Sequence, residues 1–138
     1  MFNDLDQIDW IGLRAEQVPN LIRGLASEDQ SIRNESFDRL LDTDIYERPD
    51  FAHAVVPYIL RILEHCEVNT ETELLLELLA ALRSYAEGFI GRNLAKESST
   101  AVISDIDNSK ALFLRLSKNP LAKETALELI ADIENACS

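Results

Sequence analysis

One eight-residue phrase occurs twice in the sequence. It reads "VPNLIRGL" from Val18 and "VPYILRIL" from Val56, 38 residues further on. Six of the eight positions agree in kind: the valine, the proline, two aliphatic residues, the arginine and the final leucine. Aliphatic residues three and four positions apart form the apolar face of an amphipathic helix. The repetition therefore predicts two equivalent helices, each the first helix of a repeated unit.

The same interval relates the residues that follow the phrase. A shift of 38 brings Glu35 onto Glu73, and a shift of 89 brings it onto Glu124, with a Leu-Leu or Leu-Ile pair five residues further on each time. Helix pairs that recur at such an interval are typical of an α-solenoid, in which stacked pairs bury one continuous core. The sequence thus predicts an all-α fold, a short solenoid of about three helix pairs.

We expect the 138 residues to form a single domain, because a chain of this length can bury roughly 70% of its unfolded surface. An N-terminal segment with Trp10, Ile11 and Leu13 is expected to cap the exposed edge of the first unit, because terminal repeats need a cap. The repeat units are expected at about 17–45, 50–88 and 109–137, with an irregular insertion at about 89–108 that can hold short helix.

The chain has only four glycines and four prolines, and it lacks the strand-like alternation of apolar and polar residues. Asp50 is placed to cap the third expected helix, and Gly88 is placed to end the fourth. Helices are expected at about 18–26, 31–42, 50–66, 70–86, 109–116 and 121–136.

Several stretches resemble HEAT repeats. The turn and second helix of such a repeat are similar to "LASEDQSIRNESFDRLL" and "LSKNPLAKETALELIADI", and the first helix is similar to "VPYILRIL". More narrowly, "IYERPDFAHAVVPYILRILEH" followed by "TETELLLELLAALRSYAEG" resembles a group of small bacterial HEAT-like proteins, over about residues 18 to 88. This resemblance implies a solenoid without catalytic residues, and members of the group often look like immunity or accessory proteins encoded beside toxins. Glu47, Arg48 and Pro49 stand where the group usually has Gly-Thr, so no role of that loop is carried over.

The residues that enzymes use are scarce in this chain. His53 and His65, its only histidines, lie too far apart on one expected helix to bind the same metal ion. Cys66 and Cys137 are 71 positions apart without a metal-binding spacing, and we expect two free thiols. There is no glycine-rich phosphate loop, and the "HE" dipeptide of HEAT-type iron hydroxylases is absent. We therefore expect no enzyme, no metal and no cofactor.

The charge balance favours a basic protein partner. Lys and Arg total 13 against 25 Asp and Glu, a net charge of −12, which repels nucleic acid and anionic membrane surfaces. No apolar run approaches the roughly 18 residues of a membrane-spanning helix, and the start of the chain lacks a secretory signal. We expect a soluble, cytoplasmic protein that is a monomer or a weak dimer when free.

Acidic residues lie opposite the apolar stripe on the second helix of each unit. On a helical wheel, Glu35, Glu73 and Glu124 take the same outward position. Second helices line the concave face of a HEAT solenoid, so we expect one acidic ridge. Like charges four residues apart cost roughly 0.2 to 0.5 kcal/mol per pair, which favours a binding role over the alternative of a face kept acidic for solubility. The expected partner-binding residues are Glu35, Asp42, Glu73, Glu77, Glu124, Glu128 and Asp132.

Two functions fit these features. The first is a non-catalytic immunity protein, or antitoxin, whose acidic concave face masks a basic toxin or effector. The alternative is a HEAT-type scaffold or adaptor for a housekeeping protein. A gene for a lethal product immediately beside this one would distinguish the first function from the second.

Overall fold

The regular structure of the protein is entirely helical in the part that the computed structural model describes, residues 2–136. This confirms the expected all-α class. No helix in this part is both long and apolar enough to span a membrane. The elements are a 3-10 turn at Leu5–Gln7 and the helices α1 (Val18–Leu25), α2 (Gln30–Leu41), α3 (Pro49–His65), α4 (Thr72–Gly91), α5 (Lys96–Asp107), α6 (Lys110–Leu116) and α7 (Lys123–Ala136).

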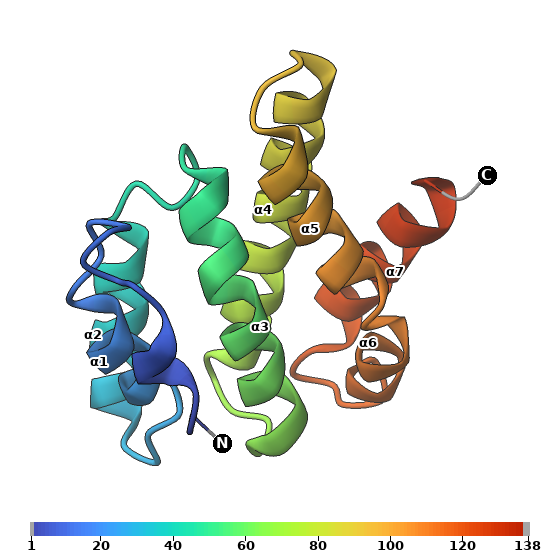
Figure 1. The fold of residues 1–138 in the computed structure, drawn as a ribbon. Helices are drawn as coiled ribbons and strands as arrows, with labels where there is room; N and C mark the ends of the chain where they lie inside the picture. The colour runs from blue at the N-terminus through green and yellow to red at the C-terminus, as the bar shows by residue number, and fades with distance from the viewer. Residues whose placement is uncertain (1, 137–138) are drawn as a thin grey trace.

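The helices follow one another across the molecule from one end to the other. Figure 1 shows α1 and α2 at one end, α3 and α4 in the middle, and α6 and α7 at the other end. The helices α1 and α2 pack together, as do α6 and α7, while α5 packs against both α3 and α4. One hydrophobic core runs through all of them. Its most deeply buried side chains include Leu5, Ile22, Leu40, Ile59, Leu79, Ile106 and Phe113.

The repeated phrase takes two different positions in its helices. In α1 the phrase begins the helix, with Pro19 in the first turn, where a missing N–H costs nothing. In α3 the helix begins earlier, at Pro49, so Pro57 lies in its interior. Asp50 was expected as the cap of this helix, but Arg48 holds that position and Asp50 lies in the first turn. A proline at the first helical position sets the backbone there, which explains the earlier start.

The end of α4 differs from the expectation. The helix continues through Gly88, which does not have a positive φ, and ends at Gly91. Asn93 adopts the left-handed conformation instead, with φ 61°. The Leu94 amide donates to the Phe89 carbonyl at 2.8 Å, and the Asn93 amide donates to the Ile90 carbonyl at 3.0 Å. These two bonds form a Schellman motif, with asparagine in the position that glycine usually takes.

The expected irregular insertion at 89–108 is wrong for most of its length, because residues 96–107 form the regular helix α5. Its buried residues Ser99, Val102 and Ile106 recur at helical spacing and face the core. The polar residues around them, Ser98, Thr100, Ser104 and Asp105, concealed this stripe in the sequence. The helix α5 thus belongs to the core of the molecule.

The N-terminal segment lies across α1 and α3. The Asp4 carboxylate binds the Arg61 guanidinium of α3 at 2.7 and 3.0 Å, and Asp6 pairs with Arg23 of α1 at 3.1 Å. Trp10, expected in a cap, is buried, and its indole N–H donates to the Leu5 carbonyl. Ile11, expected beside it, is instead 74% exposed. The segment therefore connects α1 with α3.

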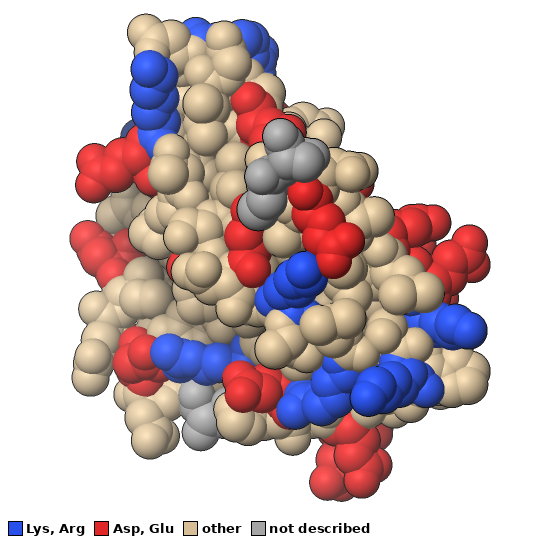
Figure 2. Space-filling model, turned by 90° about the vertical axis from the view of Figure 1, so that its right-hand side faces the viewer, with Lys and Arg blue, Asp and Glu red and all other residues tan. Residues whose placement is uncertain are grey.

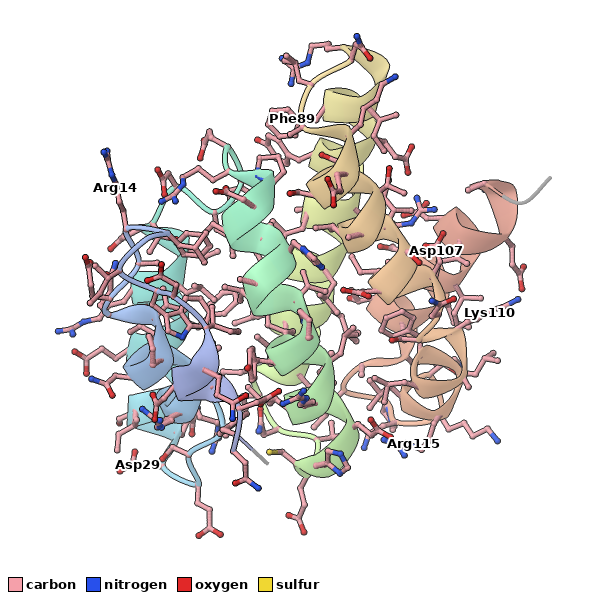
Figure 3. All side chains as sticks on the ribbon, viewed as in Figure 1. Arg14, Asp29, Phe89, Asp107, Lys110 and Arg115 are labelled. Carbon is pink, nitrogen blue, oxygen red and sulfur yellow. The ribbon has the colours of Figure 1, made fainter. Side chains whose placement is uncertain are left out.

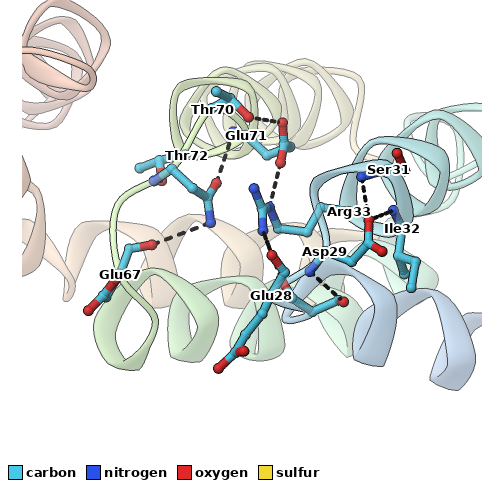
Figure 4. A network of polar contacts seen from close by, with 11 residues as sticks. Glu28, Asp29, Ser31, Ile32, Arg33, Glu67, Thr70, Glu71 and Thr72 are labelled. Carbon is cyan, nitrogen blue, oxygen red and sulfur yellow. Dashed lines mark hydrogen bonds and ion pairs between the residues drawn. The ribbon is translucent and has the colours of Figure 1, made fainter.

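A buried ion pair connects α2 with the start of α4. Figure 4 shows the Arg33 guanidinium between the two helices, with its Nε 2.5 Å from Oε1 of Glu71. Arg33 also donates to the backbone carbonyls of Ser27 and Glu28. The hydroxyl of Thr70 donates to the other Glu71 oxygen. The guanidinium and carboxylate atoms of this pair that are shielded from solvent thus have hydrogen-bond partners within the protein, as buried charges require.

Candidate functional site

A groove of about 390 Å³ lies between α4 and α7. Its α4 wall begins with Ala80 and Ser84, which lie one helical turn apart. Their small side chains leave room between the two helices. Its lining residues are Ala80, Arg83, Ser84, Glu87, Asp132, Asn135 and Ala136.

One arginine lies at the base of the groove. The side chain of Arg83 is 5% exposed, and its Nε and Nη2 bind the two oxygens of Asp107 at 2.8 and 3.2 Å. Its Nη1 donates to Glu87, one turn further along α4. The Asp107 carboxylate raises the pKa of Arg83, with smaller contributions from Glu87 and Asp132. The positive charge of the groove is therefore already bound by carboxylates of the same chain.

The structure places five of the seven expected binding residues on the two helices that form the groove. Asp132 lines the groove, and Glu73 accepts a hydrogen bond from the Thr125 hydroxyl of α7 at 3.2 Å. That bond shows that the acidic faces of α4 and α7 meet. The remaining three of the five, all exposed, are Glu77, Glu124 and Glu128.

The other two expected residues lie elsewhere. Glu35 and Asp42 are exposed on α2, which lies on the opposite side of α4 from α7 (Figure 1). Glu35 pairs with Arg39 of its own helix at 3.0 Å. The three acids that occupy equivalent positions in the sequence are thus all exposed, but only Glu73 and Glu124 belong to the helices beside the groove.

Sequence reasoning missed the residues at the base of the groove. Arg83 and Glu87 are four residues apart on one helix, a spacing that favours an ion pair and could have identified them. Asp107 could not be found in this way, because it reaches Arg83 from α5. Figure 3 shows Asp107 near the end of α5, close to α7.

In the described residues, no group of three or more His, Cys, Asp and Glu side chains is placed to hold a metal ion. His53 and His65 are exposed, near the two ends of α3. Cys66 is a free thiol, and burial raises its pKa, which keeps it protonated. Cys137, the other expected free thiol, lies outside the described residues.

The acidic character of the protein is uneven across its surface. Figure 2 shows the end of the molecule formed by α6 and α7, where basic side chains form a row across the lower part with some acidic side chains among them, and further acidic side chains lie above this row. On α4 the only basic residue is Arg83, and on α7 it is Lys123 at the first position. The two helices that form the groove are therefore both acidic overall.

Comparisons with known protein families, with curated proteins and with solved structures gave no match. The function is therefore argued from the groove and its charges.

Proposed function

We propose that this protein is a non-catalytic binding module, an immunity protein that uses the acidic groove between α4 and α7 to mask a basic toxin or effector. One observation carries the proposal. Among the described residues that line the groove, the one cation, Arg83, is held by Asp107 and Glu87, and Asp132 remains in the wall with the acids of α4 and α7 beside it. The groove is thus matched to a partner that brings its own positive charge.

The fold that we propose for this module is a HEAT-like solenoid of three helix pairs, α1–α2, α3–α4 and α6–α7, with α5 as an additional helix. Two contacts support it. Arg33 of α2 meets Glu71 at the start of α4, and Thr125 of α7 meets Glu73 of α4. Both contacts join second helices of successive units, as stacked pairs require. The pairing of α3 with α4 is supplemented by α5, which packs on both.

The charge of the groove suits fast capture of a dangerous partner. Complementary fields can raise association rate constants to about 10⁸–10⁹ M⁻¹s⁻¹ at low salt. Toxins that act on nucleic acids are commonly basic, because they must approach phosphates. An acidic protein can therefore cover the surface with which such a toxin binds its substrate.

The test is co-expression with the product of the neighbouring gene. We expect that product to be lethal alone, harmless with this protein, and recovered with it as a stoichiometric complex. A complex with a harmless neighbour would support the scaffold or adaptor function instead. A neighbour that is neither lethal nor bound would contradict the immunity function.

A further inference from the structure

The end of the molecule formed by α6 and α7 leaves large apolar side chains uncovered. Leu114 of α6, Leu121 of the following turn and Leu127 of α7 are 46%, 56% and 45% exposed. In a stacked arrangement of helices the outer side of the last pair lacks a neighbour, and apolar residues there remain in contact with water. Such a surface is a candidate for contact with another protein.

Two of these leucines lie on the same side of the helix pair. Lys110 of α6 and Glu134 of α7 form an ion pair of 2.8 Å that connects the two helices. Leu114 lies one turn after Lys110, and Leu127 lies two turns before Glu134, so each shares a helix face with one partner of this pair. The ion pair and the leucines therefore form one continuous surface.

The segment that forms α6 and the turn before α7 has a charge opposite to that of the whole protein, whereas α7 beyond Lys123 is acidic. Residues 108–123 contain four basic residues and no acidic residue, in a chain with a net charge of −12. Figure 2 shows basic side chains in a row across the lower part of this end, with uncharged surface and acidic side chains beside them. Lys118 and Lys123 are exposed beside Leu121 in the sequence. This apolar surface thus has a basic border. The basic residues are Lys110, Arg115, Lys118 and Lys123.

The opposite end of the molecule is acidic and also carries an exposed apolar side chain. Ile32 of α2 is 46% exposed, and helical spacing places Glu35 of this helix and Asp42 at its C-cap on the side next to Ile32. The basic residues nearby are already paired, Arg39 with Glu35 and Arg48 with Asp44. The acids in this part of the chain are Glu28, Asp29, Glu35, Asp38, Asp42, Asp44 and Glu47.

From this complementarity we infer that the α6–α7 end of one molecule docks on the α2 face of a second copy, head to tail. Leucines of the basic end then cover Ile32, and the lysines meet the acids of α2. Such an interface joins two different surfaces, so it leaves a free basic end and a free acidic face on every pair and can continue to a third copy. The inference is independent of the proposed immunity function, because it involves the outer sides of the two terminal helix pairs.

The experiment is sedimentation velocity on the full chain over a range of concentrations, at low and at high salt. We expect reversible association that grows with concentration and weakens with salt, because salt screens exposed charges. The double variants Lys118→Glu/Lys123→Glu and Glu35→Lys/Asp42→Lys should each weaken association by more than about tenfold, since like charges then face one another. A mixture of the two variants should associate again, because each supplies the intact surface that the other lacks.

The control is Arg92→Glu/Lys96→Glu, which changes the net charge as much as the lysine reversal but lies at the connection between α4 and α5, between the two ends of the molecule. It should associate like the unmodified protein. Equal loss in this control would overturn the inference, since overall charge would then explain the effect. Monomers at every concentration would also overturn it. The inference would also be overturned if the Glu35→Lys/Asp42→Lys variant associated like the unmodified protein, because the basic end would then pair with itself. Circular dichroism establishes that each variant is folded.

Discussion

Arg33 and Glu71 form an ion pair whose side chains are only 10% and 5% exposed, and they are 38 residues apart, the same interval as the repeated phrase. The pair joins α2 to the start of α4, and both partners have further hydrogen bonds. A buried pair of this kind is costly to break, because the charge that remains has neither water nor a counter-charge.

We therefore expect Glu71→Ala to lower the free energy of unfolding by about 3 to 5 kcal/mol. The exposed pair of Glu35 and Arg39 provides the matched control, and Glu35→Ala should cost no more than about 1 kcal/mol. Urea unfolding measures both values. Replacing both partners, as in Arg33→Met/Glu71→Leu, should cost less than Glu71→Ala alone. Equal costs for Glu71→Ala and Glu35→Ala would contradict this account of the pair.

The ion pair between Asp4 and Arg61 should make stability depend on pH in acid. The hydrogen bond from Arg61 lowers the pKa of Asp4 from its ordinary value of 3.8 to about 2. A carboxylate with a lowered pKa stabilises the fold above its ordinary pKa, and this contribution is lost as the pH falls toward the folded value. Asp4→Asn should therefore lower the melting temperature at pH 6, and the difference from the unmodified protein should vanish near pH 2. A difference that persists unchanged at pH 2 would contradict the role of the ion pair.

The acids beside the groove should control the rate at which a basic partner binds. In the variant Glu73→Lys/Glu77→Lys/Glu124→Lys/Glu128→Lys, we expect slower association with the partner and no acceleration at low salt, because the attractive field is reversed.

A control with the same change of charge is Glu16→Lys/Glu64→Lys/Glu67→Lys/Glu97→Lys. These four residues are exposed and lie outside the groove. Stopped-flow or surface-based kinetics at two ionic strengths measures both variants. Identical association rates for the two variants would indicate that the acids of α4 and α7 serve only solubility.

Arg83 should stabilise the fold as well as the base of the groove. Arg83→Met removes charge-assisted hydrogen bonds to Asp107 and Glu87, and we expect a loss of about 1.5 to 3 kcal/mol in the free energy of unfolding. Arg92→Met is the control, because Arg92 is exposed at the end of the same helix. Its cost in the same urea titration should be clearly smaller. Two equal costs would mean that the contacts of Arg83 contribute little.

Gly88 distinguishes the observed end of α4 from the one expected from the sequence. A Cβ at Gly88 would meet no atom within 4 Å, and its φ is not positive, so Gly88→Ala should stabilise the protein by about 0.5 to 1 kcal/mol. Asn93→Ala should destabilise it by about 1 kcal/mol, because alanine tolerates the left-handed conformation poorly. Thermal unfolding measures both. Destabilisation by Gly88→Ala would indicate that the helix ends at Gly88 after all.

Several features of the fold could be predicted because they depend on neighbouring residues. The repeated phrase and the stripes of leucine and isoleucine are local patterns. They predicted six of the seven α-helices found in residues 2–136 to within a few residues at most ends. The end of α4 was misplaced because glycine is the commonest residue after a helix, whereas Asn93 fills that position in this chain.

The groove depends on contacts between residues far apart in the sequence. Helical spacing alone determined that Glu73, Glu77, Glu124, Glu128 and Asp132 are exposed, because each lies opposite an apolar stripe that must be buried. Only the tertiary structure decided which acids face one another. The packing of α5 on α3 and α4 brings Asp107 to Arg83, and α7 lies beside α4 while α2 lies on the other side. Periodicity determines which face of a helix is buried, but the direction of each exposed face depends on how whole helices pack.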